Sequence, residues 1–231
     1  MLTVNNLGKY FEIHHLNQRR KAIENINFKV EKGGFLGIVG KSGSGKSTIL
    51  KCIYGTYQPQ VGQILYQSKD DGEVDLHQIP DRQLIQLRKY EIGYVSQFLK
   101  VMPRTTTLEL VVQSLLEMSV PYDKAVEKAK ETLRHFDIPE ALWDNYPNTF
   151  SGGEKLRLNI ACAIVKSPRL LLLDEPTASL DHASKLKVKE AITKLKQDGT
   201  TLIGIFHDLE FMENLCDQVY DMSTKEIGAL V

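Results

Sequence analysis

The chain has 231 residues, which places it at the large end for one domain and allows a substantial hydrophobic core. Its 29 basic and 29 acidic residues cancel, so net charge gives no reason to expect a nucleic-acid partner or an acidic membrane surface. No apolar stretch approaches the roughly 18 residues of a membrane span, and the start lacks the blocks of a signal peptide. The three cysteines are scattered without metal-ligand spacing, which predicts reduced thiols, a cytoplasmic protein and no direct membrane insertion.

The first strands of the chain have the pattern of an antiparallel sheet. Residues 2–4 and 23–30 alternate apolar and polar side chains, as half-buried strands do. Residues 63–66 and 73–76 read as a hairpin that turns through Asp71-Gly72. These segments predict an antiparallel β subdomain beside the main core.

Continuous apolar runs mark a different kind of strand. Residues 35–39, 170–173 and 201–206 are apolar almost throughout, which is typical of parallel strands covered by helices on both faces. A helix is expected from about 182 to 197, with Gly199 as its C-terminal stop. The predicted fold class is therefore α/β, with a mostly parallel sheet flanked by helices.

The stretch from 97 to 166 differs in character from both sheets. It shows helical periodicity at 108–118 and 124–136, interrupted by prolines. We interpret it as a helical subdomain inserted into one domain of residues 1–231, whose α/β core comprises 1–96 and 167–231.

A glycine-rich loop with the sequence G-K-S-G-S-G-K-S-T follows the first apolar strand and precedes a helix. The glycines allow a tight turn whose N–H groups point inward at phosphate oxygens, and the helix adds its positive N-terminal end. Lys46 can reach the β- and γ-phosphates, and the Ser47 hydroxyl can hold Mg²⁺. The nucleotide-binding residues expected here are Gly40, Ser42, Gly43, Ser44, Gly45, Lys46, Ser47 and Thr48.

Two carboxylates end the second apolar strand, in the sequence R-L-L-L-L-D-E-P. Asp174 would present its carboxylate at the carboxyl edge of the sheet, where open α/β sheets bind ligands, and would hold Mg²⁺ directly or through water. Glu175 is the candidate general base for the attacking water.

A second glycine-rich helix start is found at Ser151, Gly152 and Gly153. It offers a hydroxyl, backbone N–H groups and a helix dipole to an anion. The same residues also read as a capping box between Ser151 and Glu154, and both interpretations can hold together.

Three single residues complete the candidate set. Gln97 follows a strand and can reach the metal or the water with its amide, and His207 follows the last core strand and can bond the γ-phosphate. Asp181 lies just past the strand-end acids and could act across a subunit boundary.

In their order along the chain, these motifs resemble the complete motif set of an ABC-type ATPase. The resemblance spans essentially the whole chain and implies a P-loop NTPase core of the ABC type, ATP and Mg²⁺ as ligands, and an ATP-dependent head-to-tail homodimer. Each ATP would lie between one phosphate loop and the Ser151 segment of the other chain. It also implies an aromatic ring stacked on adenine, for which Tyr10 is the first candidate and Phe11 the alternative.

Within that superfamily, the segments 95–104, 148–154, 176–181 and 204–208 look like the L subunit of bacterial phosphonate carbon–phosphorus lyase systems. This implies a soluble ATPase subunit associated with the formation of ribose 1-methylphosphonate 5-triphosphate from ATP and phosphonate, with other soluble subunits as partners. The glycosyl-transfer chemistry would lie in those partners.

Two positions depart from the common pattern of the superfamily. Lys155-Leu156 stands where many relatives carry Gln-Gln, and Cys162 replaces a frequent Arg on the same helix. Neither belongs to the expected hydrolytic set.

Two other functions remain open from the sequence. The first is the motor of a membrane transporter, which would dock on transporter membrane subunits and share every catalytic residue. The second is a nucleotide-gated clamp with negligible turnover, against which Glu175 argues. The apolar residues of the segment 98–104 are a candidate docking patch for either kind of partner.

Overall fold

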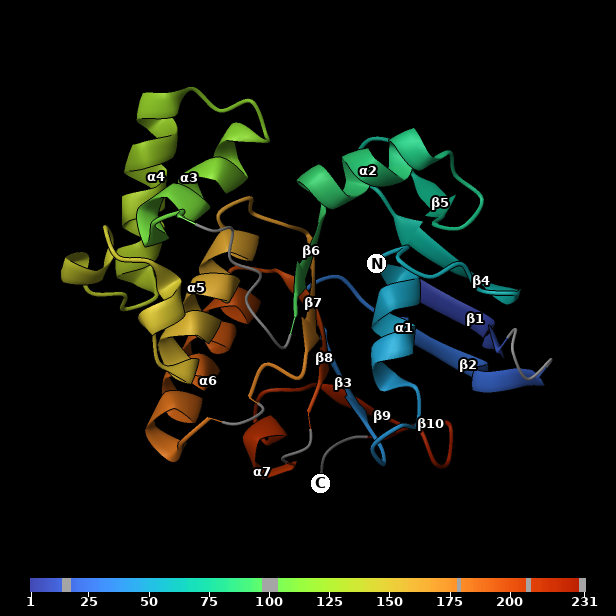
Figure 1. Cartoon of the computed structure of the whole chain (residues 1–231). Helices are drawn as coiled ribbons and strands as arrows, with labels where there is room; N and C mark the ends of the chain where they lie inside the picture. Colours follow the sequence, from blue (N-terminus) through green and yellow to red (C-terminus); the bar gives the residue numbers. More distant parts are fainter. Residues whose placement is uncertain (14–17, 97–103, 178–179, 207–208, 229–231) are drawn as a thin grey trace.

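The computed structural model describes residues 1–13, 18–96, 104–177, 180–206 and 209–228. At its centre is a six-stranded sheet in the order β10-β9-β3-β8-β7-β6 (Figure 1). Its strands are β3 (Phe35–Val39), β6 (Ile92–Val95), β7 (Leu170–Asp174), β8 (Thr201–Ile205), β9 (Gln218–Asp221) and β10 (Glu226–Gly228). All neighbours pair in parallel except β9 and β10. The carboxyl ends of β3, β6, β7 and β8 therefore meet at one edge.

The second sheet is antiparallel and has the order β2-β1-β4-β5. Its strands are β1 (Leu2–Ile13), β2 (Gln18–Val30), β4 (Val61–Gln67) and β5 (Glu73–Asp75). The hairpin expected around Asp71-Gly72 is confirmed, since Tyr66 lies opposite Val74. The first two strands are much longer than the alternating pattern predicts, because β1 and β2 continue as a paired ribbon beyond the buried part of the sheet.

Helices cover both faces of the parallel sheet. They are α1 (Lys46–Ile53), α2 (Asp81–Tyr90), α3 (Thr107–Leu116), α4 (Tyr122–His135), α5 (Gly152–Ile164), α6 (His182–Gln197) and α7 (Leu209–Met212), with short 3₁₀ turns at Glu140–Leu142 and Pro147–Thr149. In Figure 1, α1 lies between the two sheets, and α3 to α6 lie on the opposite side of the parallel sheet. The helix expected at 182–197 is confirmed, and Gly199 has a positive φ of 84° just beyond its end.

Side chains that alternate along the parallel strands divide the core into two layers. Leu170 and Leu172 pack with the antiparallel sheet and α1, whereas Leu171 and Leu173 pack with the helices on the other face. The buried side chains of α3, α4 and α5 belong to this second layer, which is continuous with the sheet. None of the helices in the described ranges is both long and apolar enough to cross a membrane.

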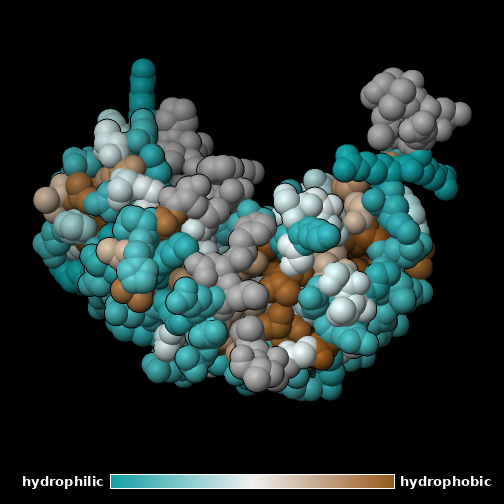
Figure 2. Space-filling model, turned by 90° about the horizontal axis from the view of Figure 1, so that it is seen from below, coloured by the Kyte–Doolittle hydropathy of each residue, from teal (hydrophilic) through white to brown (hydrophobic). Residues whose placement is uncertain are grey.

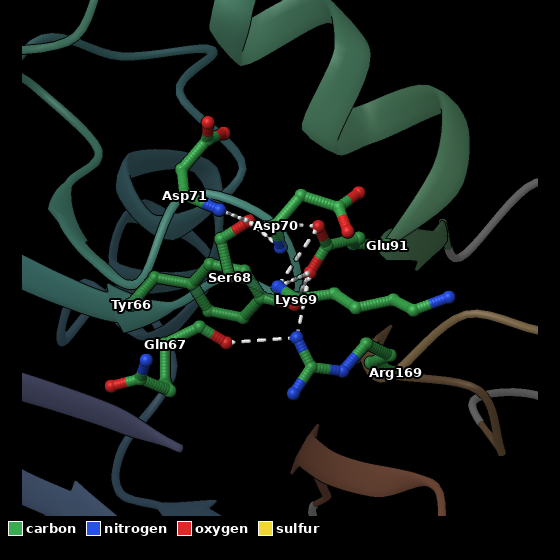
Figure 3. A network of polar contacts seen from close by, with 8 residues as sticks. All are labelled: Tyr66, Gln67, Ser68, Lys69, Asp70, Asp71, Glu91 and Arg169. Carbon is green, nitrogen blue, oxygen red and sulfur yellow. Dashed lines mark hydrogen bonds and ion pairs between the residues drawn. The ribbon is translucent and has the colours of Figure 1, made fainter.

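A buried carboxylate joins the two sheets. Glu91, which directly precedes β6, accepts hydrogen bonds from the Tyr66 hydroxyl at 3.0 Å and the Ser68 hydroxyl at 2.9 Å (Figure 3). The backbone N–H of Lys69 also donates to it. Arg169, at the start of β7, lies 2.9 Å from Oε2 of Glu91 and donates to the Gln67 carbonyl. The Glu91 side chain therefore accepts hydrogen bonds from Tyr66 in the antiparallel sheet and from Arg169 next to a strand of the parallel sheet.

We expect Glu91→Gln to lower the free energy of unfolding by about 3 kcal/mol, because it breaks a largely buried ion pair and weakens several hydrogen bonds at once. Urea denaturation checks this. Glu140→Gln is the matched control, since Glu140 makes an ion pair with Arg134 on the open surface and such pairs contribute little. Equal midpoints for the two variants would contradict the bridging role of Glu91.

Candidate functional site

A cavity of about 460 Å³ lies at the carboxyl edge of the parallel sheet, where the phosphate loop meets the β1–β2 ribbon. Seen from this side, the surface is largely hydrophilic, with hydrophobic residues gathered near the middle of the view (Figure 2). The cavity is lined by Phe11, Arg20, Lys21, Ala22, Gly43, Gly45, Lys46, Ser47, Thr48 and Glu175. Five of these residues belong to the expected phosphate loop, and one is the expected general base.

The phosphate loop has the backbone that its glycines predict. Gly40, Gly43 and Gly45 all have positive φ, at 149°, 75° and 97°. At Gly45 the reason is also close approach, since a Cβ there would lie 2.4 Å from Cγ2 of Ile23 and 2.5 Å from the carbonyl oxygen of Ala22. The loop is therefore held against β2, with α1 starting directly after it.

Lys46 is folded back over its own loop. Its ammonium donates to the carbonyls of Gly40 at 2.8 Å and Lys41 at 3.1 Å, and the residue is only 4 % exposed. The hydroxyl oxygen of Ser44 is buried and has no hydrogen-bond partner among the residues that the structure describes. An orphaned buried hydroxyl and a cation in the same loop fit an anionic ligand that supplies acceptors.

The two proposed metal ligands are in direct contact. The Ser47 hydroxyl donates to Oδ1 of Asp174 at 2.8 Å, and the Tyr94 hydroxyl lies 2.5 Å from Oδ2 of the same carboxylate. A hydroxyl and a carboxylate are the hard oxygen donors that Mg²⁺ prefers, so this pair fits a magnesium ion held beside the phosphates. The third expected ligand, Gln97, lies outside the described residues.

Glu175 occupies a strained backbone position beside the cavity. Its φ is 53°, in the left-handed region that residues other than glycine rarely adopt. Such conformations cost on the order of 1–3 kcal/mol and persist where surrounding structure enforces them, often at functional sites. Glu175, which directly follows Asp174, also lines the cavity, at the place where the sequence predicts a general base.

The far end of the cavity is formed by the β1–β2 ribbon. Phe11 borders the cavity there, together with Arg20 and Lys21. Tyr10 is not among the lining residues, and its hydroxyl donates to Glu24 at 2.9 Å. That hydrogen bond to a carboxylate raises the pKa of Tyr10. Of the two candidate rings, Phe11 therefore lines the cavity and Tyr10 does not.

The Ser151 segment forms the capping box that the sequence allows. Ser151 is the N-cap of α5; its hydroxyl accepts from the N–H of Glu154 at 3.3 Å and donates to Oε2 of Glu154 at 2.8 Å. The bond from the hydroxyl, together with one from the Ser151 backbone N–H to the same oxygen at 2.8 Å, lowers the pKa of the Glu154 carboxyl. Ser151 and Gly152 are exposed, and neither lines the cavity of the same chain.

Asp181 caps the neighbouring helix. Both of its oxygens accept from Ser184, from the N–H at 3.0 Å and from the hydroxyl at 2.7 Å, and these bonds lower the pKa of Asp181. Ser184 packs so tightly on α5 that a Cβ at Gly153 would lie 2.6 Å from its hydroxyl oxygen. The caps of α5 and α6, which carry Ser151 and Asp181, are therefore fixed side by side.

Comparison with known proteins identifies the family to which these motifs belong. A family model described as ABC transporter matches residues 23–178. The chain belongs to the ABC transporter family.

The most similar relatives include the ATP-binding protein LolD of the lipoprotein-releasing system of Legionella pneumophila, which is 35% identical over 89% of this chain and 88% of its own length. The methionine import ATP-binding protein MetN of Haemophilus influenzae is 33% identical over 95% of this chain. This chain spans only 61% of that protein's length.

Solved structures of ABC cassettes match the whole fold. The cassette MJ0796, described as dimeric and bound to ADP and Pi, superposes with a TM-score of 0.89 at 27% identity, covering 100% of this chain and 99% of the other. The ABC ATPase fold class expected from the sequence is thereby confirmed.

Two expected site residues of this ABC ATPase, Gln97 and His207, lie outside the described residues, as do the apolar residues of the candidate docking patch. In the first departure from the common pattern, Lys155-Leu156, the Leu156 side chain is buried on the core face of α5.

The sequence interpretation missed residues that this ABC ATPase gathers around the site. Tyr94, Arg20, Lys21 and Ser184 were not among the candidates. A basic run at 19–21 could have indicated the two cations, because a nucleotide is anionic. Nothing in the sequence signals the contacts of Tyr94 or Ser184, which arise from strand register and helix packing.

We expect Gly153→Ala in this ABC ATPase to push the caps of α5 and α6 apart, because the new methyl group would overlap the Ser184 side chain. ATP-dependent dimerisation should weaken at least about tenfold, while the affinity of the monomer for ATP stays unchanged, since the cavity does not include this contact. Analytical ultracentrifugation and a nucleotide titration measure the two effects. Gly228→Ala is the control for glycine replacement, because Gly228 lies in β10 without a positive φ and its Cβ would meet no atom within 4 Å.

Proposed function

We propose that this chain is the ATP-hydrolysing motor subunit of a membrane transporter. The proposal rests on one observation above the others, the convergence of the phosphate loop, the Ser47–Asp174 pair and Glu175 at the same sheet edge. The names of similar proteins, which concern methionine import and lipoprotein release, favour transport over the phosphonate interpretation. Because this chain spans only part of the methionine import relatives, substrate and membrane partners belong to the proposal.

In the proposed reaction, ATP lies along the cavity with its triphosphate in the loop. Lys46 would turn from the carbonyls of Gly40 and Lys41 to the phosphate oxygens, which offer a full negative charge in their place. Ser47 and Asp174 would hold Mg²⁺, which when bound supplies charge neutralisation to the phosphate oxygens. Adenine would stack on the ring of Tyr10 or Phe11 at the ribbon end.

Glu175 would orient and deprotonate the water that attacks the γ-phosphorus, and the proton would pass to its carboxylate. His207 would bond the γ-phosphate and Gln97 the metal or the water; these two roles follow from motif order alone. The position of Glu175 supports its role, because this residue lines the cavity directly after Asp174.

The site is proposed to be complete only in a head-to-tail homodimer. Ser151, Gly152 and Gly153 are anion-binding candidates that do not reach the cavity of their own chain, and Asp181 is fixed beside them. A second chain would bring this pair of caps to the γ-phosphate. The dimeric cassette MJ0796 with ADP and Pi is consistent with such an arrangement.

The second candidate function is the phosphonate-processing one. The sequence segments around Ser151, Asp181 and His207 support it by resemblance to the L subunits of carbon–phosphorus lyase systems. In that case the same ATPase would serve soluble subunits that form ribose 1-methylphosphonate 5-triphosphate.

We expect Glu175→Gln to reduce ATP turnover roughly 10²–10⁴-fold, because the amide cannot accept the proton of the attacking water. ATP binding should persist, so ATP with Mg²⁺ should convert this variant to a stable dimer. Phosphate release and sedimentation at micromolar protein measure the two results, with Glu210→Gln, a helix surface substitution, as control. A variant that stays monomeric with ATP would refute the composite site.

The partner class is tested by isolating the tagged chain, with ATP and without, from cells that express it natively. A transport motor should be recovered with integral membrane proteins from detergent-solubilised membranes. Recovery from the soluble fraction with phosphonate-processing subunits would instead favour the second candidate. Lys46→Ala, which should lose tight ATP binding, shows whether capture depends on the nucleotide state.

A further inference from the structure

Two hydroxyl groups from different elements hold the carboxylate of Asp174. The Ser47 hydroxyl on α1 donates to Oδ1 at 2.8 Å, and the Tyr94 hydroxyl on β6 donates to Oδ2 at 2.5 Å. Asp174 itself is 8 % exposed at the end of β7. Each oxygen of this buried carboxylate thus has a separate donor, so the plane of the carboxylate is fixed from both sides.

The position of Tyr94 is itself well determined. Tyr94 pairs with Leu172 across the β6–β7 register, which places it beside the strand that ends in Asp174. Its ring packs on Tyr54 with centroids 5.1 Å apart.

The orientation of a carboxylate matters when it is a metal ligand. The torsion at its end is soft, so an unsupported aspartate samples a broad range of orientations. Groups that bond the far oxygen of a ligand restrict that range, and their removal typically weakens metal affinity or activity 10–100-fold. Tyr94 restricts Asp174 in this way, because its hydroxyl donates to Oδ2 while Oδ1 accepts from Ser47.

We propose that Tyr94 is a positioning residue that orients Asp174 for divalent-cation binding. This inference rests on the proposed function, in which Ser47 and Asp174 hold the cation. It adds a residue of β6 to the site and links the cation to the strand that leads directly toward Gln97.

The test is a Tyr94→Phe substitution on the Glu175→Gln background, which is meant to retain ATP. Binding of Mn²⁺, measured by electron paramagnetic resonance with ATP present, should weaken about tenfold. The affinity for ATP in the presence of a chelator should stay unchanged, because Tyr94 is not among the residues that line the cavity. A general effect on folding would change both quantities.

Tyr54→Phe is the matched control. It removes a phenolic hydroxyl from the ring that packs against Tyr94 and keeps that ring, which also lies against the guanidinium of Arg88. Urea midpoints of both variants show whether either is unfolded at the assay temperature. Both should bind ATP alike, and only Tyr94→Phe should lose Mn²⁺ affinity.

The two hypotheses fail in different ways. If the Glu175→Gln chain with native Tyr94 binds no Mn²⁺ with ATP, the proposed function is at fault. If it binds Mn²⁺ and Tyr94→Phe matches Tyr54→Phe, the positioning role is wrong. Tighter Mn²⁺ binding by Tyr94→Phe would also overturn it, because Tyr94 would then be competing with the cation for the carboxylate.

Discussion

The hydrogen-bonded carboxylate of Glu91 holds the antiparallel sheet against the parallel one, and the nucleotide cavity depends on that union. The loop side of the cavity follows β3 in one sheet, whereas its ribbon side comes from β1 and β2 in the other. Gly45 approaches Ala22 so closely that no side chain fits between them. A shift of either sheet would open or close this contact. Glu91 joins the sheets at the edge opposite the cavity. The apolar side chains packed between the sheets keep the two aligned from that edge to the cavity.

The parts of this molecule that could be predicted from the sequence are those that depend on local pattern. The loop at Gly40 to Thr48 needs particular backbone angles that glycines permit, so its sequence nearly specifies its shape. The run before Asp174 could only be a buried strand, and parallel strands bring their ends together. From these two facts the Ser47–Asp174 contact follows with little further information. The helix at 182–197 could also be predicted from local sequence, because its N-cap, its apolar face and the glycine after its end all indicate the same helix.

The parts that could not be predicted depend on register and packing between distant segments. Tyr94 reaches Asp174 because β6 pairs with β7 in one particular register, and an apolar strand pattern does not specify register against a neighbour. Ser184 reaches Gly153 because α5 and α6 pack closely, which neither helix signals alone. The extension of β1 and β2 could not be predicted either. A ribbon beyond the core has no buried face, so its sequence does not need to alternate apolar and polar residues. Phe11 and Arg20 pair with each other on this extension, and the extension brings both residues to the cavity.

The capping and anion-binding interpretations of Ser151 compete for one hydrogen bond, the one that its hydroxyl donates. A serine hydroxyl has a single proton, and in this chain it is donated to Oε2 of Glu154 at 2.8 Å. A phosphate that is to accept from Ser151 must take that proton from Glu154, whose carboxylate would also repel it. The two reciprocal bonds of the capping box, from the Glu154 N–H to the Ser151 hydroxyl and from the Ser151 N–H to the Glu154 carboxylate, do not use that proton. Only the bond from the hydroxyl to Oε2 must therefore be exchanged when Ser151 donates to an anion, and the cap itself can persist. If the Glu154 side chain also turned into water, it would free the Ser151 N–H at the N-terminus of α5, an end of the helix that favours negative charge.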